Sequence, residues 1–131
     1  MIAVDTNVLL RLLIGDDPAQ AAKARRLFDR AGTEQRSIWV ADTVLVEVVW
    51  TLARAYSRDR ADIVKALRTL ASHATVVLES AVAVRDATEM FERGRADFAD
   101  CLLCCKAQSA GCEEVATFDR GMKGLPAVKL L

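Results

Sequence analysis

The chain opens with Met1-Ile2-Ala3-Val4-Asp5, a short apolar run that ends at an acid. Four apolar residues in a row predict a brief buried strand, so Asp5 would stand where that strand ends. Open parallel sheets place their ligands beyond the carboxyl ends of their strands. Asp5 is therefore a candidate functional residue, although the same aspartate could cap a helix over residues 9–13, and the two roles are compatible.

Working outward, further short runs of strand character alternate with segments whose apolar residues recur at helical spacing. The strand-like runs cover residues 37–41, 75–78, 113–117 and 127–130. The helical segments cover residues 17–31, 63–71, 83–91 and 98–110. Residues 42–56 are also predicted to be helical: their valines favour a strand, but the length of the segment and a capping Asp42 or Thr43 favour a helix. The alternation predicts an α/β fold of Rossmann-like, three-layer type, in which helices flank a central, mostly parallel sheet of about five strands.

Composition limits the class of protein. A chain of 131 residues without repeats or linkers predicts one domain, residues 1–131. Lys and Arg number 18 and Asp and Glu number 18, so there is no broad basic field of the kind that coats nucleic acid, although a local arginine patch could still bind phosphates. No secretory signal or membrane span is visible, and four reduced cysteines suit a cytoplasmic protein.

Four further acids occupy positions of interest. Glu47 interrupts an apolar run, Asp97 and Asp100 stand one turn apart at a predicted helix start, and Asp119 follows the fourth strand. Each has an ordinary structural explanation, which is capping for the aspartates and an ion pair with Arg54 for Glu47. If they converge with Asp5, their repulsion requires a multivalent cation, and oxygen-only ligands point to Mg²⁺ or Mn²⁺.

The same residues resemble a known family, the PIN-domain ribonucleases, and within it the VapC-type toxins of bacterial toxin-antitoxin pairs. The resemblance spans nearly the whole chain. It is carried by Asp5-Thr6-Asn7-Val8-Leu9-Leu10-Arg11, by Val44-Leu45-Val46-Glu47, by Asp97-Phe98-Ala99-Asp100-Cys101-Leu102-Leu103, and by Gly111-Cys112 with Thr117-Phe118-Asp119-Arg120. Cys101, Cys104 and Cys105 depart from the Ala or Ile that relatives often carry there, which leaves the acidic motif intact.

The resemblance implies a PIN-like fold and a metal-dependent endoribonuclease that hydrolyses RNA to 5′-phosphate and 3′-hydroxyl ends. It implies that Asp5, Glu47 and Asp100 form an acidic core that Asp119 completes, with Asp5 and Asp100 as the principal ligands of Mg²⁺ or Mn²⁺. Asp97 would cap its helix or assist. The supporting polar residues would be Thr6, Asn7 and Thr117. It further implies a homodimer, a VapB-type antitoxin that covers the acidic pocket, and RNA as substrate.

Other interpretations are open. A PIN-fold binding module that has lost catalysis would keep the fold alone, and an aspartate-nucleophile phosphohydrolase would use Asp5, although Asn7 replaces the second acid of that motif. A zinc site is disfavoured because most cysteines fall within one helix and no histidine accompanies them. Three of the four cysteines are expected in the core, as are the aromatic residues Trp39, Trp50, Phe28 and Phe91. The candidate RNA-binding arginines are Arg25, Arg26, Arg30, Arg54, Arg58 and Arg60.

Overall fold

The computed structural model describes residues 1–131, which group into two compact units, Met1–Ser80 and Ala81–Leu131. The first unit contains β1 (Ile2–Ala3), α1 (Thr6–Ile14), α2 (Pro18–Thr33), β2 (Ile38–Val40), α3 (Asp42–Arg54), α4 (Arg60–Ser72) and β3 (Val76–Leu78). The second contains α5 (Ala81–Arg93), α6 (Phe98–Ser109), β4 (Val115–Thr117), the 3₁₀ turn η1 (Arg120–Met122) and β5 (Val128–Leu130).

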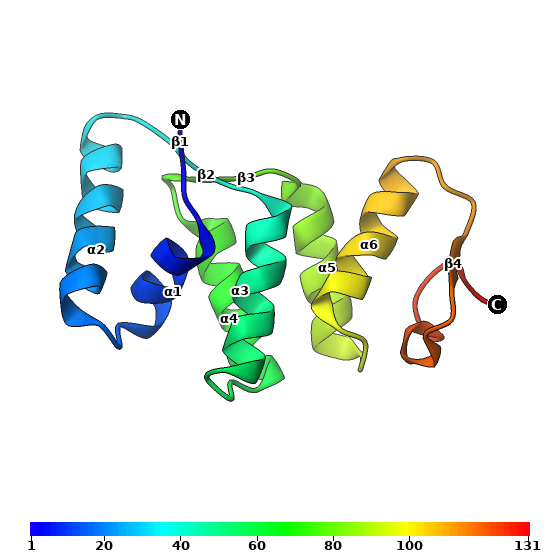
Figure 1. Ribbon diagram of the computed structural model, residues 1–131. Helices are drawn as coiled ribbons and strands as arrows, with labels where there is room; N and C mark the ends of the chain where they lie inside the picture. The colour runs from blue at the N-terminus through cyan, green and yellow to red at the C-terminus, as the bar shows by residue number, and fades with distance from the viewer. The chain divides into compact units, whose positions relative to one another are not determined.

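The first unit is built on a parallel sheet in the order β1-β2-β3. Ile2 is paired with Ile38, and Ile38 with Val76. Because the strand order follows the chain order, right-handed crossovers carry both helical connections to the same face of the sheet. Figure 1 shows α1 to α4 extending from one side of the three strands. Only two residues separate the carboxyl end of β1 from the start of α1, so α1 begins beside the edge of the sheet.

Local sequence explains where the helices of this unit begin and end. Asp17 accepts a hydrogen bond from the backbone N–H of Gln20, and Pro18 occupies the first turn of α2, where its missing N–H costs nothing. Helix α1 ends at Gly15, whose φ of 70° is the left-handed conformation that favours glycine. Helix α1 packs against α2 and α3, and α3 packs against α4.

The core of the first unit is formed mainly by buried apolar side chains. Its most deeply buried side chains are Leu9, Ile38, Val40, Leu45 and Val48. Trp50 was expected in this core, and that prediction is wrong, because its side chain is 59% exposed at the outer face of α3. Helix α3 carries apolar residues on most of its circumference, so its sequence does not show which of them faces the sheet.

The second unit is held together by α5 and α6, which pack along each other (Figure 1). Phe91 and Phe98 meet edge to face with ring centroids 6.0 Å apart, the geometry that aromatic pairs prefer. Cys101, Cys104 and Cys105 are buried beside them, whereas Cys112 is exposed, so the expectation that three of the four cysteines serve as core residues is confirmed. After Gly111 turns the chain with a φ of 83°, β4 and β5 pair in parallel.

The predicted α/β fold with parallel strands and alternating helices is confirmed, and residues 42–54 are helical as expected. Two details differ. The five strands divide into a three-stranded and a two-stranded sheet, because each has only two or three residues and so few ladder bonds to specify its partner. Glu79, rather than Asp42 or Thr43, caps α3 by accepting the Asp42 N–H at 2.9 Å. No helix has the length and apolar character needed to cross a bilayer.

Candidate active site

Asp5 lies at the junction of β1 and α1, as its sequence position predicts. Its side chain is exposed, and its Oδ1 accepts a hydrogen bond from the Val8 N–H at 3.1 Å, which satisfies one of the free donors in the first turn of α1. The capping role is thereby confirmed. Asp5 has a second carboxylate oxygen, and the exposure of the side chain leaves that oxygen available for a ligand.

Glu47 is brought to this junction by Thr6. The buried Thr6 hydroxyl donates to Glu47 Oε2 at 2.8 Å and so links the first turn of α1 to the second turn of α3. Glu47 was expected either in apolar surroundings, where it would need a cation, or projecting to solvent and paired with an arginine such as Arg54. Its side chain is exposed, so it needs no cation for burial, and the Arg54 guanidinium lies 6.0 Å from the centre of the Trp50 ring. The contact with Thr6 fixes one oxygen of Glu47 and orients the other.

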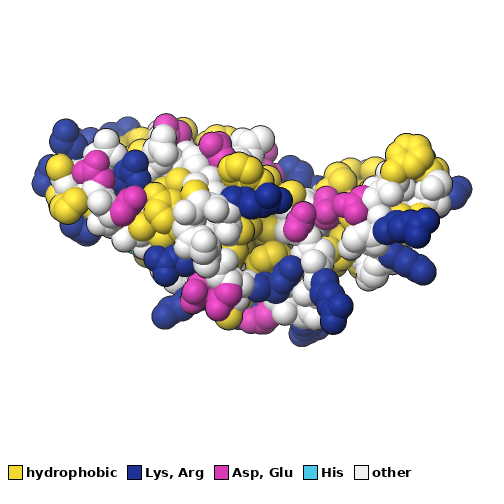
Figure 2. Space-filling model, turned by 60° about the horizontal axis from the view of Figure 1, so that its bottom comes forward, with side chains coloured by type: hydrophobic (Ala, Val, Ile, Leu, Met, Phe, Trp, Pro, Cys, Tyr) yellow, Lys and Arg dark blue, Asp and Glu magenta, His cyan; other side chains and the backbone are white.

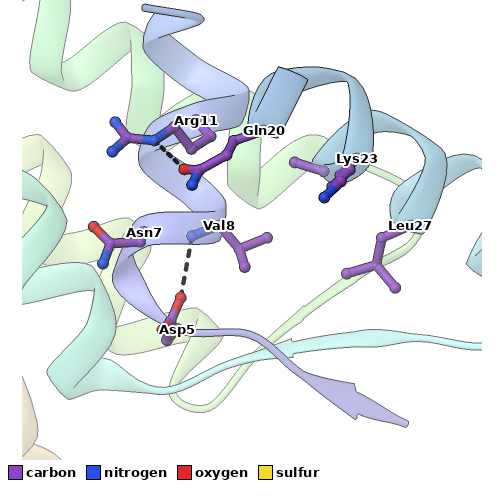
Figure 3. Close-up of a pocket in the computed structure, with 8 residues that line it drawn as sticks. Asp5, Asn7, Val8, Arg11, Gln20, Lys23 and Leu27 are labelled. Atoms are coloured by element: carbon purple, nitrogen blue, oxygen red, sulfur yellow. Dashed lines mark hydrogen bonds between the residues drawn. The ribbon is translucent and has the colours of Figure 1, made fainter. Parts of the chain in front are cut away.

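A pocket of about 370 Å³ lies between α1 and α2 beside Asp5. In Figure 3, Val8 and Leu27 line its apolar side, and Arg11 reaches across to Gln20, whose Oε1 accepts the Arg11 Nε–H at 2.7 Å. Arg11 also pairs with Asp16 at 3.1 Å, and the Tyr56 hydroxyl donates to Asp16 at 2.9 Å. This last hydrogen bond, with the charge of Arg11, lowers the pKa of Asp16. Arg11 is thus committed to a structural network, and the side chains of Asp5, Asn7 and Lys23 leave polar groups available on the pocket.

In the second unit, Asp119 is held in a defined turn after β4. Its N–H donates to Thr117 Oγ1 at 3.0 Å, and its Oδ1 accepts the Gly121 N–H at 2.8 Å. The Asp119 side chain therefore caps the 3₁₀ turn η1 while remaining exposed. Thr117 binds the backbone of Asp119 through its hydroxyl oxygen and so helps to position the Asp119 carboxylate.

Asp100 lies in the first turn of α6 and is half-buried. Its burial raises the pKa of its carboxyl group above the ordinary value, and the negative charges of Asp97 and Asp119 raise it further. Asp97 occupies the N-cap position of α6, but its side chain makes no capping hydrogen bond, so the expectation that it caps the helix is wrong. The backbone carbonyl of Asp97 accepts the Asp100 N–H instead, which leaves the Asp97 carboxylate exposed near Asp100.

The structure thus brings the predicted acids together in two sets. In the first unit, Glu47 is hydrogen-bonded to Thr6, the residue that follows Asp5, and in the second the carboxylates of Asp97, Asp100 and Asp119 interact. Both sets offer oxygen donors, the chemistry that Mg²⁺ and Mn²⁺ prefer, and a cation would offset the repulsion that raises the pKa of Asp100. No group of three or more His, Cys, Asp or Glu side chains is arranged as a complete metal-binding cluster.

The cysteines Cys101, Cys104 and Cys105 of α6 are buried. Burial raises the pKa of the Cys104 thiol, and the charge of Asp100 raises it further. Burial likewise raises the pKa of Cys105. Zinc binds the thiolate form, which these shifts disfavour, so the thiols are suited to their role as apolar core groups.

Two features were missed by sequence reasoning. Phe118, next to Asp119, is 82% exposed. It follows the last residue of β4, and side chains beyond the end of a strand no longer alternate between its two faces. This position was the signal from which its exposure could have been predicted. Asp42 is buried and accepts the Ser80 hydroxyl at 2.7 Å, a contact between residues 38 apart that no local pattern reveals. On the face drawn in Figure 2, Lys and Arg side chains are spread among acidic and apolar ones.

Comparison with known proteins identifies the family of the chain. Residues 2–128 match the family model described as PIN domain, a range that covers both units. The chain is also 28% identical over 125 residues to a protein named VapC ribonuclease from Aquifex aeolicus (strain VF5). That alignment covers 95% of this chain and 92% of the relative. With the match extending over almost its entire length, the chain belongs to the PIN-domain family.

Proposed function

We propose that this protein is a metal-dependent endoribonuclease toxin that hydrolyses RNA phosphodiester bonds. The observation that carries the proposal is the group of interacting carboxylates around the half-buried Asp100, within a chain that matches the PIN domain throughout. The name of the Aquifex aeolicus relative supports ribonuclease activity and a toxin of the VapC type. Residues 1–131 would then act as one PIN domain.

Asp5, Glu47, Asp100 and Asp119 are the proposed catalytic and metal-binding residues. Asp5 and Asp100 would be the principal ligands of Mg²⁺ or Mn²⁺, and Glu47 and Asp119 would hold a second ion or position water. When bound, such an ion polarises a phosphoryl oxygen and lowers the pKa of a water molecule. The protein's own contribution is orientation. Thr6 fixes Glu47, and Thr117 and the Gly121 N–H fix Asp119.

Asn7 and Asp97 are proposed as supporting residues. Both are exposed, Asn7 on the pocket beside Asp5 and Asp97 beside Asp100, so each can hold a water molecule or a ribose hydroxyl near the acids. Attack by water on phosphorus, in line with the departing 3′ oxygen, would break the P–O3′ bond and produce a 5′-phosphate and a 3′-hydroxyl.

The proposed partners follow from the kinship with the VapC relative. A VapB-type antitoxin would neutralise the activity by covering the acidic residues, and an arginine from it would pair with their carboxylates in place of the metal. The toxin would act in the cytoplasm, where its RNA substrates are, and as a homodimer.

The test is an end-mapped cleavage assay with protein purified free of any partner. Incubation with transfer, ribosomal and messenger RNA in Mg²⁺ or Mn²⁺ should give discrete cuts with 5′-phosphate ends, and EDTA should stop them. The Asp100→Asn protein serves as the inactive control. Cuts that leave a 2′,3′-cyclic phosphate or that persist in EDTA would contradict the proposal. RNA that is bound but never cut would identify a binding module instead.

A further inference from the structure

The second unit contains a pocket that the proposed catalytic residues do not line. It has a volume of about 530 Å³ and lies between the loop that follows α5 and the loop from η1 to β5. Its lining residues are Met90, Arg93, Gly94, Arg95, Ala96, Gly121, Gly124, Leu125 and Pro126. The volume falls within the range of roughly 300–1,000 Å³ that small-molecule sites occupy.

The charged side chains that line this pocket are arginines. The lining contains two of them and no carboxylate. Arg93 is exposed in the last turn of α5, and its planar guanidinium has the paired N–H donors that match two oxygens of a phosphate group. Lys123 adds a further exposed cation to the loop that forms the opposite wall. The pocket is therefore suited to an anion.

The rest of the lining is apolar or lacks side chains. Met90 and Leu125 are half-buried and present thioether and aliphatic surface, and Pro126 adds to it. Three glycines, Gly94, Gly121 and Gly124, leave parts of the wall as bare backbone. A flat ring can approach such a wall closely. In RNA, the flat group nearest to a phosphate is the base of the same nucleotide.

The pocket is coupled to one of the candidate catalytic acids. Gly121, which lines the pocket, donates its N–H to Asp119 Oδ1 at 2.8 Å. A Cβ atom at this position would lie 3.0 Å from the same oxygen, so a side chain there would displace the Asp119 carboxylate. A ligand seated against this backbone contacts the turn that orients Asp119.

We infer that this pocket binds a nucleotide of the RNA strand next to the bond that is cut. Its phosphate contacts Arg93, and its base lies on Met90 and Leu125. This inference rests on the proposed ribonuclease function. Apart from its two arginines, the lining offers no polar side chain that could distinguish one base edge from another, so the pocket reads little of the sequence of the strand.

Steady-state cleavage of a short RNA substrate tests the inference. Arg93→Gln should raise KM about 10-fold and reduce the slope of log(kcat/KM) against log[salt] by about 0.7 to 1, because one phosphate contact is lost. Arg85→Gln is the matched control. Arg85 is an exposed arginine on the same helix that pairs with Asp86 and does not line the pocket, so KM and salt slope should not change. An Arg93→Gln protein with the KM and slope of the wild type would overturn the inference.

A binding measurement separates failure of the pocket from failure of the proposed function. Adenosine 5′-monophosphate should shift the NMR resonances of residues 90–96 and 121–126 in the wild type but not in the Arg93→Gln protein, and inorganic phosphate should bind more weakly. If the wild type cleaves no RNA, the ribonuclease proposal fails while these shifts still report on the pocket. If RNA is cleaved but the nucleotide shifts none of these resonances, or an oligoglutamate peptide displaces it, the inference is wrong.

Discussion

Asp100 is a half-buried carboxyl group with two carboxylate neighbours, Asp97 and Asp119. Replacing it with asparagine removes a proposed metal ligand and also removes charge repulsion. We expect Asp100→Asn to lower kcat/KM by about 100-fold or more, since the loss of a residue that only supports a ligand already costs about 10- to 100-fold. The metal-free fold should be at least as stable as the wild type. Unfolding of the variant under native conditions would show that Asp100 is structural.

The pH dependence of stability gives a second readout for the same residue. Because burial and the neighbouring acids raise the pKa of Asp100 in the folded chain, the folded state binds its proton more tightly than the unfolded state. The wild type therefore loses stability as the pH rises from the unfolded pKa, about 3.9, through the raised folded value. The amide that replaces this carboxyl group in Asp100→Asn cannot ionise. In denaturant titrations without metal, the free energy of unfolding of Asp100→Asn should exceed that of the wild type at pH 7, and this difference should disappear near pH 3.

Thr6 is a buried hydroxyl whose bond to Glu47 can be removed without changing side-chain volume. Thr6→Val should reduce RNA cleavage about 10- to 100-fold because Glu47 loses its orientation, and should lower the free energy of unfolding by about 1 kcal/mol. Thr6→Ser keeps the hydroxyl and is the control. Equal loss of cleavage in both variants would mean that the methyl group, and not the hydrogen bond, is the feature that matters.

The 3₁₀ turn η1 holds Asp119 through the backbone of Gly121. Gly121→Ala adds a methyl group 3.0 Å from Asp119 Oδ1, so the carboxylate must shift by a few tenths of an ångström. We expect kcat to fall with the circular dichroism spectrum unchanged, by less than the roughly 100-fold that a displacement of about 1 Å can cost. Gly32→Ala in α2 is the control, since its new Cβ would meet only Thr75 Oγ1 at an ordinary contact distance of 3.5 Å. Equal kcat in the two variants would contradict the positioning role.

The helices and strands could be predicted from sequence because their signals are local. Asp17-Pro18 starts α2, Gly111 follows α6, and each short apolar run became a strand. Two properties depend on distant residues and could not be predicted. Glu79 caps α3 from the end of β3, and Trp50 faces outward although apolar residues surround it in sequence. Periodicity cannot select the buried face of a helix that is apolar on most sides.

The two compact units each hold part of the predicted acidic site. Sequence indicated Asp5, Glu47, Asp100 and Asp119 because acids at strand ends and helix starts are conspicuous in an α/β pattern. It could not reveal that Thr6 holds Glu47, that Phe118 is exposed, or that the strands divide into two sheets, since these depend on tertiary packing. The family match extends through both units, which supports the proposal that their acids serve one reaction.

Metal should link the stabilities of the two units if their acids serve one ion. Mg²⁺ at 100 times its dissociation constant should stabilise the folded chain by about 2.7 kcal/mol. In hydrogen-exchange measurements, EDTA should then reduce the protection of α1 in the first unit and of α6 in the second. Loss of protection in one unit only would place the ion entirely within that unit.

The most direct test is calorimetric titration of Mn²⁺ into the wild type, Asp5→Asn, Asp100→Asn and the double variant. If Asp5 and Asp100 ligate the same ion, each single change should weaken Mn²⁺ binding at least about 10-fold. The double variant should then lose less binding free energy than the sum of the two single losses, because the effects of residues that share a partner are not additive. Losses that add, or Mn²⁺ binding that neither change affects, would contradict a shared metal centre.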